Sequence, residues 1–162
     1  LLEMITQSTI NYLKAQISAG ADLVQVFDSW AGILGPDQYE EFSLKYIRLI
    51  CEAIDEVPKT VFAKGAFFAR KDMGSLPCET IGLDWNMEIK ESRALIGSNK
   101  TLQGNLDPAA LYGTADQVVA ATQKMMKQFK GSRHIANLGH GVYPDINPER
   151  VKDFIQAVKS FS

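Results

Sequence analysis

The sequence predicts an α/β fold in which a parallel sheet is covered by helices. Five short apolar runs alternate with longer segments whose apolar residues recur every three or four positions, a pattern typical of βα units. None of the runs leads into a GxGxxG or GxxxxGK turn, so neither usual nucleotide-binding signature is present. Four polar residues within the runs could point into the lumen of a closed sheet near its mouth: Gln25, Gln103, Asn105 and Asn137. These two observations favour a barrel over an open, doubly wound sheet.

The first half of the chain predicts two helix–strand pairs. The first helical pattern closes at Gly20, a residue type that commonly ends helices. Pro36 suits the first turn of a long second helix, and Pro58 follows its end. Val26 and Phe62, together with Leu106 further along, are expected to line the inside of the barrel. The predicted elements are helices at 2–19 and 36–57 and strands at 23–27 and 60–63.

The second half predicts three more strands. Thr114 and Gln117 have the spacing of a capping box, and Gly131 follows the helix that they begin. Asn147 suits the N-cap of the last helix and Pro148 its first turn. No low-complexity linker marks a domain boundary, so we expect one domain. The predicted elements are helices at 73–78, 87–95, 114–129 and 148–161 and strands at 80–84, 101–106 and 135–138.

Composition argues against several classes of protein. The 162 residues are 46% hydrophobic and 22% charged, and no apolar run approaches the roughly 18 residues that span a membrane. The net charge is −2 and the basic residues are scattered, so we expect neither nucleic acid nor a membrane as partner. Cys51 and Cys78 lack metal-ligand spacing, and two isolated cysteines favour a reducing cytoplasm. Because Leu1 already lies in a helical pattern, we expect a fragment whose earlier part is absent.

The most informative motif is NLGHGVYPD, residues 137–145, which follows the last predicted strand. His140 lies between two glycines at the carboxyl end of that strand, where α/β proteins place their ligands. Glycine on both sides permits a sharp turn and the close approach of a ligand. His140 is therefore a candidate binding residue, although a lone histidine in a tight βα turn is also compatible with a plain surface position.

Three further segments support this interpretation: QVFDSWAGILGP at 25–36, GLDW at 82–85 and LQGNLDP at 102–108. Together with NLGHGVYPD, in this order and spacing, they resemble the carboxy-terminal part of the uroporphyrinogen decarboxylase family. The resemblance covers nearly the whole chain. It implies a (βα)8 TIM barrel, of which about five strand–helix units are present. Residues 1–162 would then be the carboxy-terminal portion of a single barrel domain whose amino-terminal portion is absent.

The resemblance also implies a reaction. Members of this family remove four acetate carboxyl groups from uroporphyrinogen III, a macrocycle with eight carboxylates, to give coproporphyrinogen III in porphyrin and haem biosynthesis. Protonation of a pyrrole ring makes the substrate its own electron sink, so the reaction needs no metal and no organic cofactor. The resemblance further implies a cytoplasmic enzyme that forms a homodimer.

Three residues of this chain match substrate-binding positions of the family. Ser29 matches a serine that hydrogen-bonds a substrate carboxylate, and His140 matches a histidine that binds a carboxylate arm. Phe27 matches an apolar wall residue beneath the macrocycle, although plain barrel core explains this residue equally well. Without the resemblance, a strand-end turn or a helix cap would explain Ser29 as well as function does.

Other residues near strand ends have weaker claims to a role. Lys64 and Arg70 follow a strand and could raise the local potential, but a solvated loop explains both more simply. Asp107 precedes a proline and is expected to cap a helix, whereas Asp84 has no assigned role. His134 precedes its predicted strand, at the stability face of a barrel, and is expected to be exposed to solvent.

The family pattern is incomplete in this chain. Its arginine-rich loop, the aspartate that hydrogen-bonds the pyrrole nitrogens and a tyrosine near the site belong to the absent portion. We therefore expect no catalytic residue here and no decarboxylation by this chain alone. Two alternatives stay open. A zinc-dependent corrinoid or thiol methyltransferase of the same superfamily needs a His-x-Cys pair, which the sequence lacks. A non-catalytic barrel fragment could instead serve as a binding or assembly module.

Overall fold

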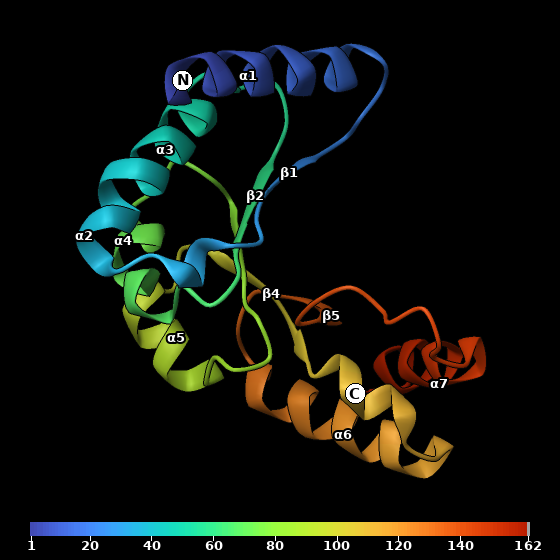
Figure 1. The fold of residues 1–162 in the computed structure, drawn as a ribbon. Helices are drawn as coiled ribbons and strands as arrows, with labels where there is room; N and C mark the ends of the chain where they lie inside the picture. The colour runs from blue at the N-terminus through green and yellow to red at the C-terminus, as the bar shows by residue number, and fades with distance from the viewer. Residues whose placement is uncertain (162) are drawn as a thin grey trace.

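The computed structural model describes residues 1–161, in which five strands form one parallel sheet (Figure 1). The strands are hydrogen-bonded to one another in sequence order. Each lies within two residues of its predicted range, which confirms the parallel α/β interpretation. They are β1 (Val24–Asp28), β2 (Lys59–Ala63), β3 (Thr80–Gly82), β4 (Thr101–Leu106) and β5 (His134–Leu138).

Helices connect the strands and lie along the outer side of the sheet (Figure 1). The predicted capping box of Thr114 and Gln117 is formed, and Asn147 caps the last helix as predicted. The α-helices are α1 (Leu2–Ser18), α2 (Pro36–Tyr39), α3 (Lys45–Glu52), α4 (Arg70–Gly74), α5 (Ile89–Ile96), α6 (Ala115–Phe129) and α7 (Pro148–Lys159). Shorter turns are η1 (Ala31–Ile33), η2 (Glu40–Leu44), η3 (Phe67–Ala69) and η4 (Pro108–Tyr112), of which η2 is π-helical and the others 3₁₀.

Two of the predicted helices differ from those in the structure. The helix expected at 36–57 is divided into α2, the π turn η2 and α3, and it ends at Glu52. The helix expected at 73–78 lies instead at Arg70–Gly74. Pro77 accounts for this earlier end, because proline cannot donate a helical hydrogen bond and disfavours helical backbone in the residue before it.

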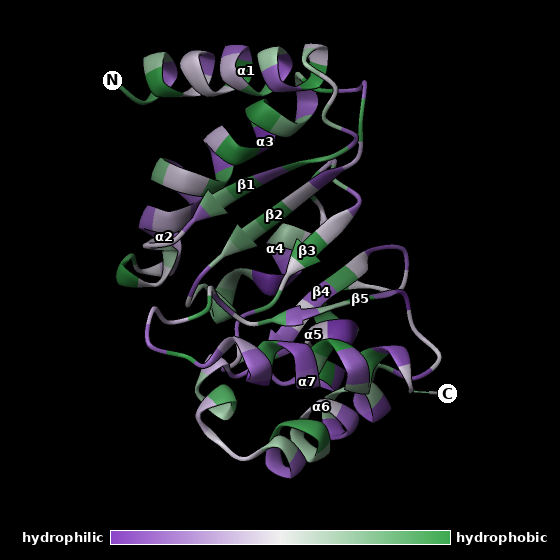
Figure 2. Ribbon diagram, turned by 90° about the vertical axis from the view of Figure 1, so that its right-hand side faces the viewer, coloured by the Kyte–Doolittle hydropathy of each residue, from purple (hydrophilic) through white to green (hydrophobic). Residues whose placement is uncertain are grey.

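The main hydrophobic core lies between the sheet and the helices. Val61, Ile81 and Leu102, on the three central strands, have no exposed surface. Figure 2 shows that β1 and β2 are predominantly hydrophobic, whereas α6 and α7 alternate hydrophobic and hydrophilic residues, as expected of helices with one buried face. Val26 and Leu106 contact this core, so the prediction that they line the inside of the barrel was wrong.

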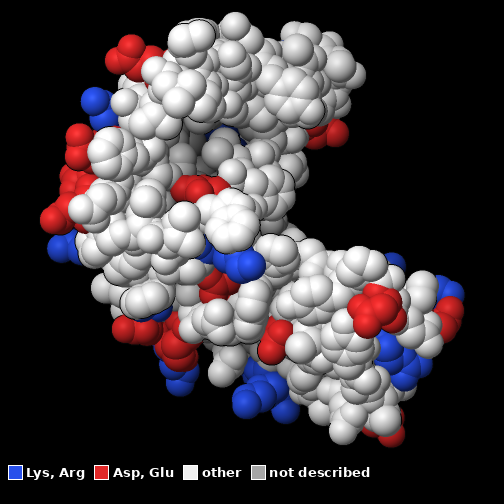
Figure 3. Space-filling model, in the orientation of Figure 1, with Lys and Arg blue, Asp and Glu red and all other residues white. Residues whose placement is uncertain are grey.

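The sheet is rolled like part of a barrel wall. The side chains of Gln25 on β1 and Gln103 on β4 hydrogen-bond across the concave face, with Nε2 of Gln103 donating to Oε1 of Gln25 at 3.3 Å. Two strands separate β1 from β4 in the sheet, so only a strongly curved sheet allows this contact. Figure 3 shows the molecule open on one side, where the concave face forms a hollow. This roll confirms the partial barrel that the sequence predicts.

Three of the four polar strand residues face this hollow as predicted, namely Gln25, Gln103 and Asn137. Asn105 does not. Its amide nitrogen donates to the backbone carbonyls of Asp84 at 3.0 Å and Met87 at 2.8 Å, and the residue is buried. Asn105 therefore joins β4 to the loop after β3 rather than facing a ligand.

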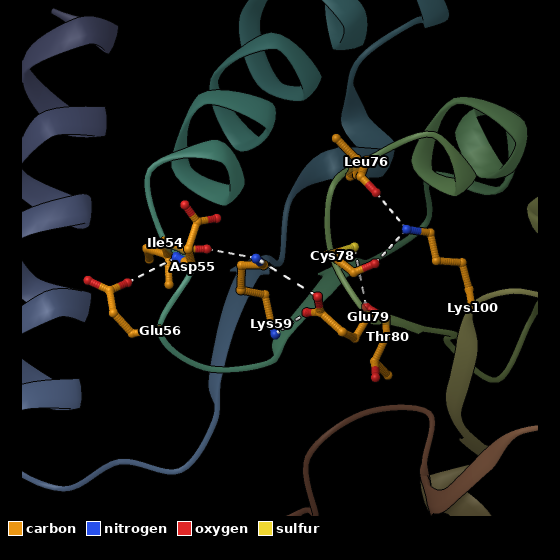
Figure 4. Close-up of polar contacts among 9 residues, drawn as sticks. All are labelled: Ile54, Asp55, Glu56, Lys59, Leu76, Cys78, Glu79, Thr80 and Lys100. Carbon is orange, nitrogen blue, oxygen red and sulfur yellow. Dashed lines mark hydrogen bonds and ion pairs between the residues drawn. The ribbon is translucent and has the colours of Figure 1, made fainter.

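Buried lysines hold the amino ends of β2 and β4 (Figure 4). Nζ of Lys59 donates to the backbone carbonyl of Ile54 at 2.7 Å, and its backbone N–H donates to the carboxylate of Glu79 at 2.7 Å. Nζ of Lys100 donates to two backbone carbonyls in the loop before β3. Each charge is thus buried with hydrogen-bond partners, which makes this edge of the sheet the stabilising end of the barrel.

His134 also belongs to this end, and the prediction that it is exposed was wrong. It is the first residue of β5, and its half-buried ring stacks on Phe129 with ring centroids 3.6 Å apart. Burial lowers the pKa of His134 below its usual range. The contact of its Nε2 with the carbonyl oxygen of Gly104, at 2.7 Å, opposes this shift, and the charge of Arg93 adds to it. If the last strand is taken to begin at residue 134, the alternation of side chains along it places the His134 ring on the helix side of the sheet.

We expect the protein to lose stability in acid through His134. Its pKa is lower in the folded than in the unfolded chain, so the unfolded chain binds the proton first. The stability is fully present above the unfolded pKa of about 6.5 and declines as the pH falls towards the folded pKa. Urea unfolding between about pH 7.5 and about pH 5.5 should show a weaker pH dependence in His134→Gln than in wild type. An undiminished dependence in His134→Gln would contradict the assignment.

We also expect this chain to associate when it is expressed alone. Within residues 1–161, β1 and β5 each have one neighbouring strand, so their outer edges present backbone amides and carbonyls. One face of α1 is exposed: on it, Met4 is 72% exposed and Tyr12 is 63% exposed. Covering apolar surface is worth about 25 cal/mol per Å². Light scattering should therefore show dimers or larger species, which Tyr12→Lys should reduce. A cooperatively unfolding monomer would contradict this expectation.

Candidate active site

A cavity of about 370 Å³ lies on the concave face, at the carboxyl ends of the strands. Parallel βα folds place their ligands at this edge, because the loops that follow the strands meet there. Phe27, Ser29 and His140, the three residues predicted from the sequence, all line the cavity, so the structure brings them together. The remaining lining residues are Gln25, Phe62, Gly82, Leu83, Gln103, Asn137, Leu138, Gly139 and Gly141.

Ser29 lies in the turn that follows β1, and its side chain faces the cavity. The turn η1 begins beyond it at Trp30 without a side-chain cap, so Ser29 is not a helix cap. Within residues 1–161, the Ser29 hydroxyl has no hydrogen-bond partner in the protein. An exposed hydroxyl of this kind can donate a hydrogen bond to a carboxylate that enters the cavity.

A half-buried pair of polar side chains adjoins Ser29 in the chain. The hydroxyl of Ser43 donates to the carboxylate of Asp28, the last residue of β1. The Tyr39 side chain is buried beside them, and burial together with the charge of Asp28 raises its pKa well above the usual range. Ser43 belongs to the π turn η2, a type of distortion that often lies near functional sites. These contacts fix the turn that carries Ser29.

Aromatic rings form one wall of the cavity. Phe27 is 67% exposed, and its ring meets Phe62 edge-on with centroids 6.0 Å apart. The Phe62 ring lies in turn 6.3 Å from that of His140. Gly82 makes room for this wall, because a Cβ atom there would come within 2.8 Å of the Phe62 ring. Phe27 therefore presents apolar surface to the cavity rather than filling the core.

His140 is positioned by the loop after β3. Its ring meets that of Trp85 edge-on, with centroids 6.0 Å apart. The preceding residue, Gly139, lies so close to the Trp85 backbone nitrogen that any side chain there would overlap it. The contact between the loop after β3 and the loop after β5 thus requires glycine at 139. This contact fixes the position of His140 at the cavity.

The loop that continues from His140 is anchored to η4. The hydroxyl of Tyr112 donates to Oδ1 of Asp145 at 2.6 Å, and the rings of Tyr112 and Tyr143 stack with centroids 6.2 Å apart. The hydrogen bond to Asp145 raises the pKa of Tyr112, because the carboxylate favours the neutral phenol. Two exposed tyrosines thereby hold the NLGHGVYPD segment against the neighbouring loop.

Asp84, which the sequence left unassigned, is a buried structural residue. Its carboxylate accepts hydrogen bonds from the backbone N–H groups of Gly65 at 2.7 Å and Asn86 at 3.0 Å. It therefore ties the loop after β2 to the loop after β3. In the GLDW motif, Asp84 joins the two loops and Trp85 contacts the histidine.

Arg70 is not in a solvated loop, so that prediction was wrong. The residue is 6% exposed, and its guanidinium donates to Ser92 Oγ at 3.0 Å and to the Glu91 carboxylate at 2.9 Å. These bonds join α4 to α5, because Arg70 is the first residue of α4 and points back towards the helix layer. Asp107 caps η4 as predicted, with its carboxylate accepting from the Ala109 N–H at 2.8 Å.

Phe62, which the sequence predicts to line the inside of the barrel, lines the cavity, and this prediction is confirmed. Trp85 is the residue that the sequence analysis missed. Trp85 was quoted within a motif but given no role, although a tryptophan just after a strand end is a signal that could have been used. The rolled sheet places both rings beside that of His140.

The described residues offer no ready metal site. Within residues 1–161, no three His, Cys, Asp or Glu side chains lie together in a way that could hold a metal ion. Cys51 and Cys78, isolated in the sequence, are both buried and lie beside each other. The contact with Cys78, together with burial, raises the pKa of the Cys51 thiol. The same residues include no helix that is long and apolar enough to cross a membrane.

The fold and the cavity define this chain as part of a (βα)-barrel protein with a cavity at the carboxyl ends of the strands. The family model for uroporphyrinogen decarboxylase (URO-D) matches residues 1–161. The chain belongs to the uroporphyrinogen decarboxylase family, as the motifs around Ser29 and His140 predict.

Individual relatives agree with this assignment. The chain is 46% identical to the uroporphyrinogen decarboxylase of Christiangramia forsetii, over 99% of this chain and 48% of the relative. It is 40% identical to that of Danio rerio, over 100% of this chain and 46% of the relative. A methyltransferase from Methanosarcina mazei has a similar fold, with a TM-score of 0.85 and 22% identity over 95% of this chain and 46% of the other. The chain thus spans about half the length of the relatives it matches.

Proposed function

We propose that this chain is the carboxy-terminal portion of a uroporphyrinogen decarboxylase and supplies one wall of its substrate site. The proposal rests chiefly on one observation: Ser29 and His140, from opposite ends of the chain, line the same cavity at the carboxyl ends of the strands. Both lie in the motifs that match the family, and homologues with this name align with the whole chain.

The proposed reaction removes carbon dioxide from the four acetate arms of uroporphyrinogen III and yields coproporphyrinogen III. Protonation of a pyrrole carbon first makes the ring a cation. The electron pair of the bond between the acetate methylene and its carboxylate then flows into the ring as carbon dioxide leaves. The resulting methylene group accepts a proton to become a methyl group, and the ring carbon releases the proton that it gained, so one proton is consumed for each carbon dioxide formed. The substrate thus serves as its own electron sink, and neither a metal nor an organic cofactor is required.

Each candidate residue has a role that suits this substrate. The Ser29 hydroxyl and an N–H of the His140 ring would each donate a hydrogen bond to a carboxylate arm. Phe27, with Phe62 behind it, would present an apolar surface to the macrocycle face. The group that stabilises the pyrrole cation, an aspartate in the family, would come from the amino-terminal portion. This chain would therefore bind substrate and leave the catalytic step to residues outside it.

The direct test is turnover by the full-length protein that contains this segment. We expect it to convert uroporphyrinogen III to coproporphyrinogen III. Chromatography of the oxidised porphyrins would measure this conversion. Residues 1–162 alone should be inactive and should regain activity when the amino-terminal portion is supplied as a separate chain. A folded full-length protein that binds the porphyrin without turning it over would instead support the binding-module alternative.

The methyltransferase alternative has less support. The similarity to the Methanosarcina mazei protein, at 22% identity, concerns the fold alone. A zinc-dependent enzyme of that kind needs thiolate and imidazole ligands close together, and residues 1–161 bring no such group together.

Compartment and assembly are part of the same proposal. We infer a cytoplasmic location, which two buried cysteines without a disulfide support. We also infer a homodimer of the full-length protein, which the exposed apolar side chains beside the cavity support. Trp30 and Ile33, in the turn after β1, are 75% and 72% exposed.

In the full-length enzyme, His140→Ala should weaken substrate binding or slow the later decarboxylations without abolishing turnover. A charge-assisted hydrogen bond to one carboxylate among eight is worth about 1.5–3 kcal/mol, or roughly 10–100-fold in KM, and the other arms remain held. Steady-state kinetics with each porphyrinogen intermediate would measure this effect. His134→Gln, which removes the other histidine, should leave turnover at neutral pH unchanged. Complete loss of activity in a folded His140→Ala protein would point instead to proton transfer by His140.

We expect the full-length enzyme to keep its activity after exhaustive chelation. The proposed reaction needs no metal ion, and residues 1–161 bring together no group of side chains that could hold one. The measurement is decarboxylase activity before and after dialysis against a strong chelator, with metal analysis of both samples. Stoichiometric zinc that is lost together with activity would overturn this expectation and favour the methyltransferase alternative.

A further inference from the structure

The loops at the mouth of the cavity contain a single Lys or Arg residue. These loops, which follow the described strands β1 to β5, span residues 29–35, 64–69, 83–88, 107–114 and 139–147, and Lys64 is their only strongly basic residue. Arg70, the next basic residue along the chain, is buried and paired with Glu91. Any cationic contact that this half of the barrel makes with an anionic ligand at the mouth therefore falls to Lys64.

The side chain of Lys64 and the predicted substrate-binding histidine contact the same ring, that of Trp85. Nζ of Lys64 lies over the Trp85 ring, 5.6 Å from the ring centroid, and the same ring meets His140 edge-on at 6.0 Å. Within residues 1–161, no Asp or Glu oxygen lies within the 4.0 Å of an ion pair with this Nζ. An aromatic face attracts a cation without neutralising it, so the ammonium group keeps its full charge for a ligand.

The backbone that carries Lys64 is held firmly. Its N–H donates to the carbonyl oxygen of Asp28 at 3.0 Å, and its carbonyl accepts from the N–H of Gly32 at 2.9 Å. The next residue, Gly65, donates its N–H to the buried carboxylate of Asp84. Lys64 is thus attached on one side to the turn that carries Ser29 and on the other to the loop that carries Trp85. The backbone of Lys64 is therefore fixed relative to the segments that carry Ser29 and Trp85, while its side chain can move.

We infer that Lys64 is a further substrate-binding residue, whose ammonium group binds a carboxylate of the macrocycle at the rim that it shares with His140 and Trp85. This inference rests on the proposed function, which supplies a substrate with eight carboxylates. Trp85 holds the lysine stem and the imidazole apart, so that the two donors can reach neighbouring carboxylates rather than compete for one. Lysine suits this position because a point charge on a flexible stem can adjust to the position of a carboxylate arm.

The inference is tested in the full-length enzyme with Lys64→Met, which keeps an unbranched apolar stem over Trp85 and removes the charge. KM for uroporphyrinogen III should rise on the order of 10-fold or more, because a charge-assisted contact is lost, while kcat changes by less than about threefold. The wild-type KM should also rise with added salt more steeply than that of the variant. Lys64→Arg should stay within about threefold of wild type. Lys71→Met removes the same charge from the exposed surface of α4 and should change neither constant.

Each other result would overturn the inference. An unchanged KM in Lys64→Met, with wild-type activity present, would show that Lys64 only packs over Trp85. A fall in kcat at constant KM would indicate a role in proton transfer instead. If Lys64→Met and Lys64→Gln both failed to fold by circular dichroism, Lys64 would be a structural residue. An inactive wild-type enzyme, by contrast, would refute the proposed function itself, so the two failures can be told apart.

Discussion

The roll of the parallel sheet is the constraint on which the rest of the structure depends. Parallel strands present their carboxyl ends at one edge, but a flat sheet would spread the following loops along a line. In this chain the sheet curves until Gln25 of β1 meets Gln103 of β4 across the concave face. That curvature turns a row of loops into the rim of a cavity. It places Ser29, near the start of the chain, opposite His140, near its end.

The two edges of the sheet use polar residues differently. At the amino edge, three basic side chains are at least half-buried and form hydrogen bonds with nearby backbone carbonyls, namely those of Lys59, Lys100 and His134. At the carboxyl edge, Ser29 and Lys64 have no such partner among residues 1–161. Groups satisfied within the protein contribute to stability, whereas groups left open at a cavity can bind a ligand. This division supports placing the substrate site at the carboxyl edge.

The loops at that edge are held by contacts between loops rather than by regular structure. The Asp84 carboxylate binds the backbone of Gly65, and Gly139 lies against the backbone of Trp85. The segments that carry Lys64 and His140 are thereby attached to the loop after β3. Such attachment holds binding groups in place before a ligand arrives, which reduces the ordering cost of binding. The GLDW motif in the sequence therefore reflects contacts between loops.

The sequence by itself determined the features that depend on local chemistry. The strands, the caps at Thr114, Asn147 and Asp107, and the family motifs were all read correctly, because each depends on residues close together in the chain. Only the tertiary structure decided which surface each side chain meets. In a sheet with helices on one side and a cavity on the other, both faces of a strand carry apolar residues. The alternation of side chains along a strand shows which residues share a face, but not whether that face meets the helices or the cavity. Val26 and Phe62 were therefore assigned to the same face and lie on opposite ones. Arg70 and Asn105 found buried partners only once distant segments came together.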